Sequence, residues 1–158
     1  MAKILVVYFS QTGNTRKMAE AVKEGVEKEG IEVNLKELKD IKADDLLKYE
    51  GLIIGSPTYY GTMAAEIKQL LDDSVKFHGK LDGKVGAAFS SSANIGGGNE
   101  TTVLDILQAL LIHGMIIQGD PHGDHYGPVA VGTPDGRSIR QCQRLGSRVA
   151  RLVKKIYG

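Results

Sequence analysis

The chain has 158 residues, of which 42% are hydrophobic and 25% are charged, a size and balance typical of one compact domain with a buried core. The formal net charge is only +1, so no broad electric field is present to gather nucleic acid or an anionic membrane. Cys142 is the only cysteine, which excludes an internal disulfide and a cysteine-ligated metal or iron–sulfur centre. We therefore expect any electron chemistry to need an organic cofactor.

The first residues, MAKILVVYFS, form a short apolar run that lacks the longer apolar region and cleavage site of a signal peptide. No apolar stretch approaches the roughly twenty residues that span a bilayer. We expect a cytoplasmic protein that neither inserts into a membrane nor binds nucleic acid.

Apolar runs of strand length alternate with segments of helical period, which predicts an α/β protein with a parallel sheet covered on both faces. The first run, residues 3–9, is continuous and rich in valine, as a strand buried on both faces should be. The second, residues 32–37, alternates apolar and polar residues, as expected at a sheet edge. The other three strands are expected at residues 51–55, 84–90 and 115–118.

Between these strands the spacing of apolar residues fits helices. A first helix carries Met18, Ala21, Val22, Gly25 and Val26 on one stripe, and Gly30 stands where a helix would stop. Later helices are expected at residues 64–71, 101–113 and 139–156, and residues 121–137, without a clear period, are expected to form a long ordered loop near the site. The sequence predicts one domain, residues 1–158, built as a three-layer, doubly wound, five-stranded parallel sheet of strand order 2-1-3-4-5.

In such a sheet, ligands bind beyond the carboxyl ends of the strands where the winding reverses, so the loops after the first, third and fourth strands should meet. The first of these loops, SQTGNT at residues 10–15, runs straight into a helix. Free backbone N–H groups, hydroxyls and the positive end of the helix dipole suit a phosphate, although such residues also cap helices that bind nothing. Neither a Walker loop nor a GxGxxG dinucleotide motif is present.

The other two loops are also unusual. SPTYYGTM at residues 56–63 sets two tyrosines between a proline and a glycine, so a flat ring could lie against it, or the tyrosines could pack on the next helix. SSSANIGGGNE at residues 90–100 contains three consecutive glycines, which fit either a close approach of backbone to a ligand or a flexible loop.

These loops resemble those of the flavodoxin superfamily, and most closely those of the WrbA-type NAD(P)H:quinone oxidoreductases. The resemblance covers nearly the whole chain and rests on MAKILVVYFSQTGNT, GSPTYYGTM, FSS with GGGNE, HGM before the fifth strand, a later YG and a C-terminal helix. It implies a non-covalently bound FMN. Its phosphate would be held by Ser10, Thr12, Gly13, Asn14 and Thr15. Its ring would be flanked by Pro57, Thr58, Tyr59, Tyr60, Gly61, Ser91, Ser92, Ala93, Asn94, Ile95, Gly96 and Gly97.

The resemblance also implies a catalytic, flavin-contacting role for His113; from the residues alone, a histidine before Gly114 is more often a helix-terminal residue that interacts with the dipole. The chain departs from the family in lacking an insertion after the second strand and any tryptophan. The substrate-side residues are therefore expected to be Phe77, His78, His125 and Tyr126.

The leading functional hypothesis is a two-electron reductase that takes hydride from NAD(P)H and passes electrons to a quinone or another small acceptor. The main alternative is a flavodoxin-type carrier that exchanges single electrons with a redox protein partner; a non-catalytic FMN-binding module is a third. A phosphorylated receiver domain of similar topology is disfavoured, because Ser10 and Ser56 stand where it would need acidic residues. The resemblance further implies a homo-oligomer, either a dimer or a tetramer.

Two other patterns predict no catalytic role. His122, Asp124 and His125 lack a fourth partner at metal-binding spacing, so no metal site is predicted. Five arginines step through the last helix and predict a solvated basic stripe or a subunit contact; they are Arg137, Arg140, Arg144, Arg148 and Arg151.

Overall fold

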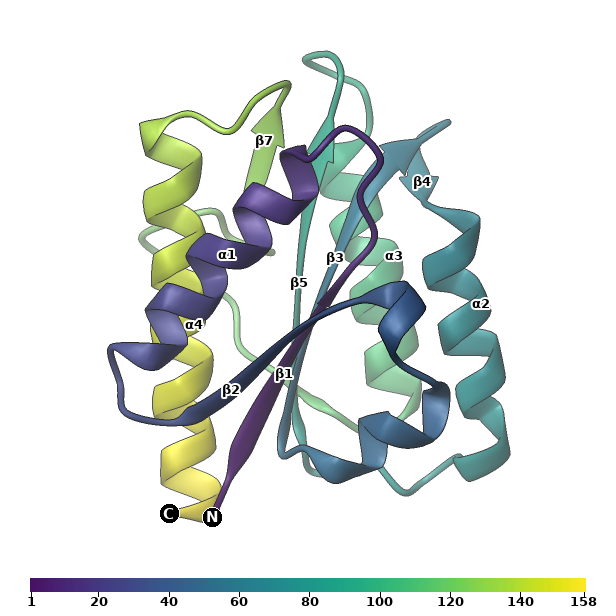
Figure 1. Ribbon diagram of the computed structural model, residues 1–158, viewed down its shortest axis with the longest axis vertical. Helices are drawn as coiled ribbons and strands as arrows, with labels where there is room; N and C mark the ends of the chain where they lie inside the picture. The colour runs from purple at the N-terminus through teal and green to yellow at the C-terminus, as the bar shows by residue number, and fades with distance from the viewer.

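The computed structural model describes residues 1–158 and has three layers (Figure 1). A parallel sheet in the order β2-β1-β3-β5-β6 forms the middle layer, as the sequence predicted. Its strands are β1 (Lys3–Tyr8), β2 (Glu32–Glu37), β3 (Gly51–Tyr59), β5 (Val85–Ser92) and β6 (Ile116–Ile117). The helices are α1 (Asn14–Glu27), α2 (Ala65–Asp73), α3 (Asn99–Ile112) and α4 (Gly136–Tyr157), with 3₁₀ turns at Leu38–Asp40, Ala43–Lys48 and Ser74–Phe77.

Strand β1 shows why the sheet is covered on both sides. Ile4 and Val6 point toward α1 and α4, whereas Leu5 and Val7 point toward α2 and α3, and all four side chains are fully buried. Successive side chains of a strand alternate between the two faces, so a continuous apolar run can fill two cores at once. None of the helices is long and apolar enough to cross a membrane.

The structure differs from the prediction at the third and fifth strands. Strand β3 continues to Tyr59 and turns back through the two-residue antiparallel strand β4 (Thr62–Met63). The fifth strand is split: β6 pairs with Val85 and Gly86, and β7 (Val129–Val131) pairs with Ser90–Ser92 farther along the same edge of β5. Residues 121–137 are therefore not one loop, because they contain β7 and the first residues of α4.

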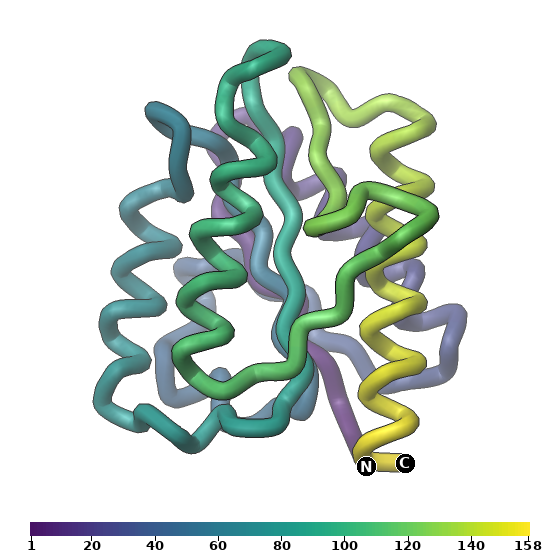
Figure 2. Tube along the Cα trace, turned by 180° about the vertical axis from the view of Figure 1, so that it is seen from behind, coloured from purple at the N-terminus to yellow at the C-terminus, as the bar shows by residue number.

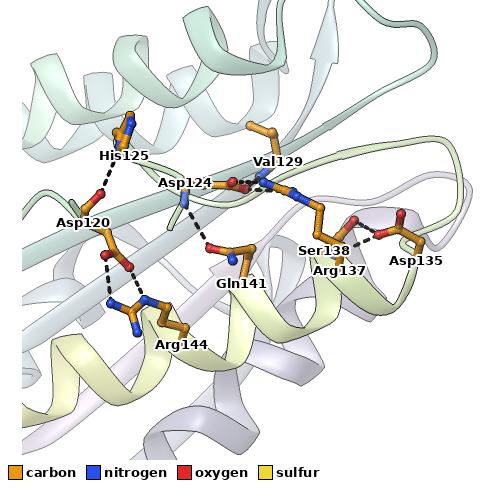
Figure 3. Close-up of polar contacts among 9 residues, drawn as sticks. All are labelled: Asp120, Asp124, His125, Val129, Asp135, Arg137, Ser138, Gln141 and Arg144. Atoms are coloured by element: carbon orange, nitrogen blue, oxygen red, sulfur yellow. Dashed lines mark hydrogen bonds and ion pairs between the residues drawn. The ribbon is translucent and has the colours of Figure 1, made fainter. Parts of the chain in front are cut away.

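Residues 118–128, the excursion between β6 and β7, leave the sheet edge toward α4 and return (Figure 2). Asp120 in the excursion accepts N–H bonds from Nε and Nη2 of Arg144, and Asp124 pairs with Arg137 and accepts the N–H of Val129 (Figure 3). These contacts fasten the start of β7 to α4.

Four of the five arginines for which a solvated stripe or a subunit contact was expected make ion pairs within the chain, and the subunit contact stays a prediction. Arg137 binds Asp124, Arg144 and Arg148 contact Asp120, and Arg151 pairs with Glu29, which lies just beyond the end of α1. Arg140 makes no ion pair in the structure. The row of arginines therefore holds the excursion and α1 against α4.

Candidate functional site

The carboxyl ends of β1, β3 and β5 meet at one end of the sheet, and three consecutive serines of β5 connect the loops there (Figure 1). The Ser90 hydroxyl lies 3.0 Å from that of Thr58, and the Ser91 hydroxyl lies 3.0 Å from that of Thr15. Ser92 accepts a hydrogen bond from the Asn99 side-chain amide at 3.0 Å and donates to the Asn94 carbonyl. Since strand side chains alternate, this run reaches elements on both faces of the sheet.

The first loop leaves backbone N–H groups free at the start of α1. Gly13 precedes the helix in the left-handed region (φ 91°), no side chain caps the helix, and the first N–H with a backbone partner is that of Lys17, which bonds the Gly13 carbonyl. In α4, by contrast, Asp135 accepts the N–H of Ser138. Free N–H groups at the positive end of a helix dipole form an anion site, so the α1 terminus fits a phosphate.

The side chains of this loop are not equivalent. Thr12 is exposed and Asn14 half-buried, and neither side chain makes a hydrogen bond in the structure. The Ser10 hydroxyl accepts the N–H of Gly13 at 3.1 Å. Thr15 is buried, and its hydroxyl pairs with Ser91, so we expect Thr15 to offer an anion its backbone N–H rather than its hydroxyl.

The second loop is a hairpin with an aromatic tip. Tyr60 and Gly61 lie between the paired residues Tyr59 and Thr62, and both have positive φ angles, 49° and 83°. Two-residue hairpins with two positive φ angles favour Asn-Gly, so a tyrosine here is strained. Tyr60 is fully exposed, which makes it a free aromatic surface at the tip of the hairpin.

Tyr59 links the first and second loops. Its hydroxyl donates to the side-chain carbonyl of Gln11 at 2.8 Å, and its ring meets that of Phe9 edge to face. Partial burial raises the pKa of Tyr59, which keeps the phenol protonated and able to donate.

The glycines of the third loop serve different purposes. Gly96 has φ 70° and faces open space, whereas Gly98 (φ 100°) packs against the hairpin tip: a Cβ there would lie 2.8 Å from the Gly61 Cα. Gly98 is therefore required for contact between the two loops, in addition to any approach to a ligand. Ile95, which directly precedes Gly96, is almost fully exposed.

The combined rim has no side chain that is charged at neutral pH. Residues 10–15, 56–63 and 90–99 contain no Asp, Glu, Lys, Arg or His, and neither do residues 128–134, which β7 brings alongside Ser90–Ser92. Charged side chains lie on the first turns of the helices that follow these segments. They are Arg16 and Lys17 on α1, Glu66 on α2, and Glu100 and Asp105 on α3. The rim therefore presents hydroxyls, backbone groups and two exposed apolar tips.

The structure places His113 at the opposite end of the molecule. His113 follows α3, beside Gly83 and the amino end of β5; its Nε2 lies 2.7 Å from the Ser74 hydroxyl, and its ring stacks near that of Phe77. Within one chain, the prediction of a flavin-contacting, catalytic His113 is therefore wrong. A crossover helix runs antiparallel to the strands, so its last residue lies far from their carboxyl ends.

His113 is instead a core residue. The Ser74 hydroxyl donates to the Leu71 carbonyl and so accepts from the protonated Nε2, which leaves the buried Nδ1 of His113 without a partner. Burial lowers the pKa of His113, and neighbouring His78 lowers it further. His113 is therefore held neutral.

The expected substrate-side residues are also displaced. Phe77 and His78 lie beside His113, at the amino ends of the strands. His125 and Tyr126 lie in the excursion at the flank of β5, where the Nδ1 of His125 is 2.8 Å from the Asp120 carbonyl (Figure 3). Within one chain, none of the four reaches the rim. Cys142 is buried in α4, and burial raises the pKa of its thiol to about 12, so it is an unreactive core residue.

Comparison with known proteins agrees with this architecture. Residues 6–110 match the model of the family described as Flavodoxin. The chain belongs to the flavodoxin family. A flavodoxin of Aquifex aeolicus is 42% identical over 162 aligned positions, covering 97% of this chain and 88% of that protein.

The chain is also similar to proteins that carry names other than flavodoxin alone. A NAD(P)H dehydrogenase (quinone) of Archaeoglobus fulgidus is 34% identical over 190 positions, covering 99% of this chain and all of that protein. A crystal structure of a flavodoxin described as a WrbA-like protein, from Agrobacterium tumefaciens, superimposes with a TM-score of 0.83 at 27% identity and covers 99% of each chain. The chain is thus a flavodoxin-family protein near the WrbA type.

The flavodoxin family implies FMN, and the rim fits this group. The uncapped start of α1 offers N–H donors for a phosphate, while the side chains of Thr12 and Asn14 are free to add further donors. The rim brings no carboxylate near that phosphate, and Gly96 leaves open space where any other residue would place a Cβ. The same family therefore supports electron transfer through FMN as the general activity.

Several residues that shape this site were missed from the sequence. Thr101 and Asp105, on the first turns of α3, bind the hairpin tip, and the Thr102 hydroxyl lies 2.9 Å from the Gly98 carbonyl, to which it donates, and 3.2 Å from the Thr58 hydroxyl. A threonine pair after a glycine run is the only signal that could have indicated them. Strand β7 was not predicted because its three residues are too few to show an alternation of apolar and polar side chains.

Proposed function

We propose that this chain binds one FMN without covalent attachment and works as a two-electron oxidoreductase, with NAD(P)H as the donor and a quinone or similar small molecule as the acceptor. Bound FMN supplies the hydride and electron chemistry. The protein's part is to bind and orient the cofactor and to leave one ring face accessible.

In this proposal the phosphate is held by the N–H groups that open α1 and by Ser10, Thr12, Gly13 and Asn14. The fused ring is flanked by Pro57–Gly61 on the hairpin side and by Ser92–Gly97 on the other. The exposed N–H groups of the glycine-rich loop would face the oxygen-bearing edge of the ring, where they stabilise negative charge in the reduced cofactor.

The uncharged rim is the observation that most directly supports a two-electron oxidoreductase. Proteins that exchange electrons with a protein partner commonly use complementary charge to steer and orient the encounter. Here residues 10–15, 56–63, 90–99 and 128–134 offer no such charge. The third loop also lacks an aromatic residue that could cover the ring, so a neutral small acceptor fits this rim better than a charged protein surface.

A one-electron carrier is the second candidate, and chain length favours it. The Aquifex flavodoxin aligns over 162 positions, close to this chain's length, whereas the NAD(P)H dehydrogenase (quinone) alignment runs to 190 and so includes segments that this chain lacks. The histidine expected at a reductase site is also at the other end of this chain.

Anaerobic reduction separates the two candidates. FMN-loaded protein is mixed with NADH or with NADPH, the loss of the yellow absorbance is followed, and a neutral quinone is then added. The proposal predicts rapid bleaching by at least one nucleotide and repeated turnover with the quinone. Bleaching by dithionite but by neither nucleotide would favour the carrier.

A further inference from the structure

The Thr101 hydroxyl joins two loops of the proposed site. It lies 2.9 Å from the Gly61 carbonyl and 2.8 Å from the Gly98 carbonyl, one from the hairpin tip and the other from the end of the glycine run. A hydroxyl has a single hydrogen, so it donates to one carbonyl at a time. Both carbonyls nevertheless converge on the same side chain, which stands on the first turn of α3.

Besides the antiparallel pairing of β3 with β4 and the contact with Gly98, the hairpin tip has few contacts that fix its backbone. Gly61 is exposed, a Cβ at that position would meet nothing, and glycine lets the peptide that follows rotate at low cost. A further anchor is the bond from the Thr62 hydroxyl to Asp105, which stands one turn beyond Thr101 on the same face of α3. Asp105 holds a side chain of the hairpin, whereas Thr101 holds its backbone carbonyl.

Thr101 and Gly98 act on the same contact. Because Gly98 lets the third loop approach the Gly61 Cα, the two loops meet at this point, and the hydroxyl sets the direction of the Gly61 carbonyl within the contact. The orientation of the Gly61–Thr62 peptide decides which polar backbone group the hairpin turns toward the rim.

We propose that Thr101 is a positioning residue for the cofactor: its hydroxyl fixes the Gly61–Thr62 peptide and thereby sets FMN affinity and the reduction potential of bound FMN. This inference rests on the proposed FMN site. It does not depend on whether the donor is NAD(P)H or a protein.

The test uses Thr101→Val, which keeps the side-chain shape but removes the hydroxyl, and Thr101→Ser, which keeps the hydroxyl. Gln108→Ala is the control, since Gln108 is exposed on the same helix, makes no hydrogen bond in the structure and lies outside the rim. Three quantities are measured: the ¹⁵N shift of the Thr62 amide without FMN, the FMN dissociation constant and the midpoint potential of bound FMN.

Thr101→Val is expected to move the Thr62 shift, to raise the dissociation constant about fivefold from the loss of one hydrogen bond, and to change the potential. Thr101→Ser and Gln108→Ala should remain close to wild type in all three. An unchanged Thr62 shift in Thr101→Val, or a changed shift with wild-type affinity and potential, would overturn the proposal. Wild-type protein that takes up no FMN would instead overturn the proposed function, and this is seen before any variant is made.

Discussion

The hydroxyls of Thr15 on α1 and Ser91 on β5 lie 3.0 Å apart, although the two residues are 76 positions apart in the sequence. This buried bond ties the first turn of α1 to the end of the central strand. It fixes the N–H groups at the start of α1 relative to the third loop. The phosphate-binding part and the ring-binding part of the proposed site are therefore held in a fixed relative position.

Replacing two threonines of the first loop should therefore have different effects. Thr15→Val leaves the buried Ser91 hydroxyl without its partner and is expected to lower the free energy of unfolding by about 1–2 kcal/mol. Thr12→Val, at an exposed and unbonded side chain, should leave stability unchanged and weaken FMN binding about tenfold, from the loss of a hydrogen bond to a charged phosphate. Urea unfolding and FMN titration measure the two effects, and equal stability loss in both variants would contradict the assignment.

Gly98→Ala tests the contact between the second and third loops. Its Cβ would lie 2.8 Å from the Gly61 Cα, in addition to the cost of φ 100°, so we expect a loss of about 2–4 kcal/mol in the free energy of unfolding. Gly96→Ala is the control, because Gly96 also has a positive φ but faces open space; it should cost only about 1 kcal/mol. Similar losses in the two variants, measured by urea unfolding, would show that the loops do not touch as described.

Tyr60→Asn should separate stability from function. Asparagine tolerates the left-handed conformation better than tyrosine and suits this hairpin, so thermal unfolding is expected to shift upward by the equivalent of about 0.5–1 kcal/mol. Loss of the exposed ring should at the same time weaken FMN binding. A variant that is less stable, or that binds FMN as tightly as wild type, would refute the view that Tyr60 is kept for the site.

Acid should lower the stability of the fold by protonating Asp120 in the excursion. The Arg144 guanidinium beside it holds the pKa of Asp120 well below the ordinary value, so the carboxylate stabilises the fold above the unfolded-state pKa near 4, and this contribution is lost as the pH falls below about 4. Asp120→Asn should be less stable than wild type by about 1–3 kcal/mol at pH 7.

The difference between the two proteins should shrink steadily as urea unfolding is repeated from pH 5 down to pH 2.5. A difference that stays constant with pH would mean that the Asp120 charge is not the source of the stability. Asp45→Asn offers a comparison at a more exposed lysine pair, where a smaller effect is expected.

The uncharged rim makes a kinetic prediction. The rate of electron transfer to a neutral quinone, expressed as kcat/KM, should change less than about twofold between low and high salt, since no charged side chain of the rim steers the encounter. A steep fall with salt for a protein acceptor, together with poor turnover of quinones, would favour the carrier.

The core strands could be predicted because burial on both faces leaves continuous apolar runs such as KILVVY in β1. Strands β4 and β7 could not, since two or three residues have no period and are held only by pairing with Thr58–Tyr59 and Ser90–Ser92. The expected homo-oligomer and cytoplasmic location stay predictions, which sedimentation and cell fractionation would test.

The first and second loops were located from the sequence because short polar or aromatic residues follow a buried strand directly. The misplacement of His113, Phe77 and His78 had a physical cause that topology reveals: they stand just before strands β6 and β5 begin, and residues before a parallel strand lie at its amino end. The bonds of Thr101 and Asp105 to the hairpin join segments about forty residues apart, and no local pattern encodes them.

The most direct test of the central claim compares FMN with riboflavin, which has the same ring but no phosphate, by fluorescence titration of the purified apoprotein. If the start of α1 holds the phosphate, FMN should bind at micromolar concentrations or below and at least about a hundredfold more tightly than riboflavin, given several charge-assisted hydrogen bonds. Equal affinity for the two compounds, or no uptake of FMN at micromolar concentrations, would contradict the account.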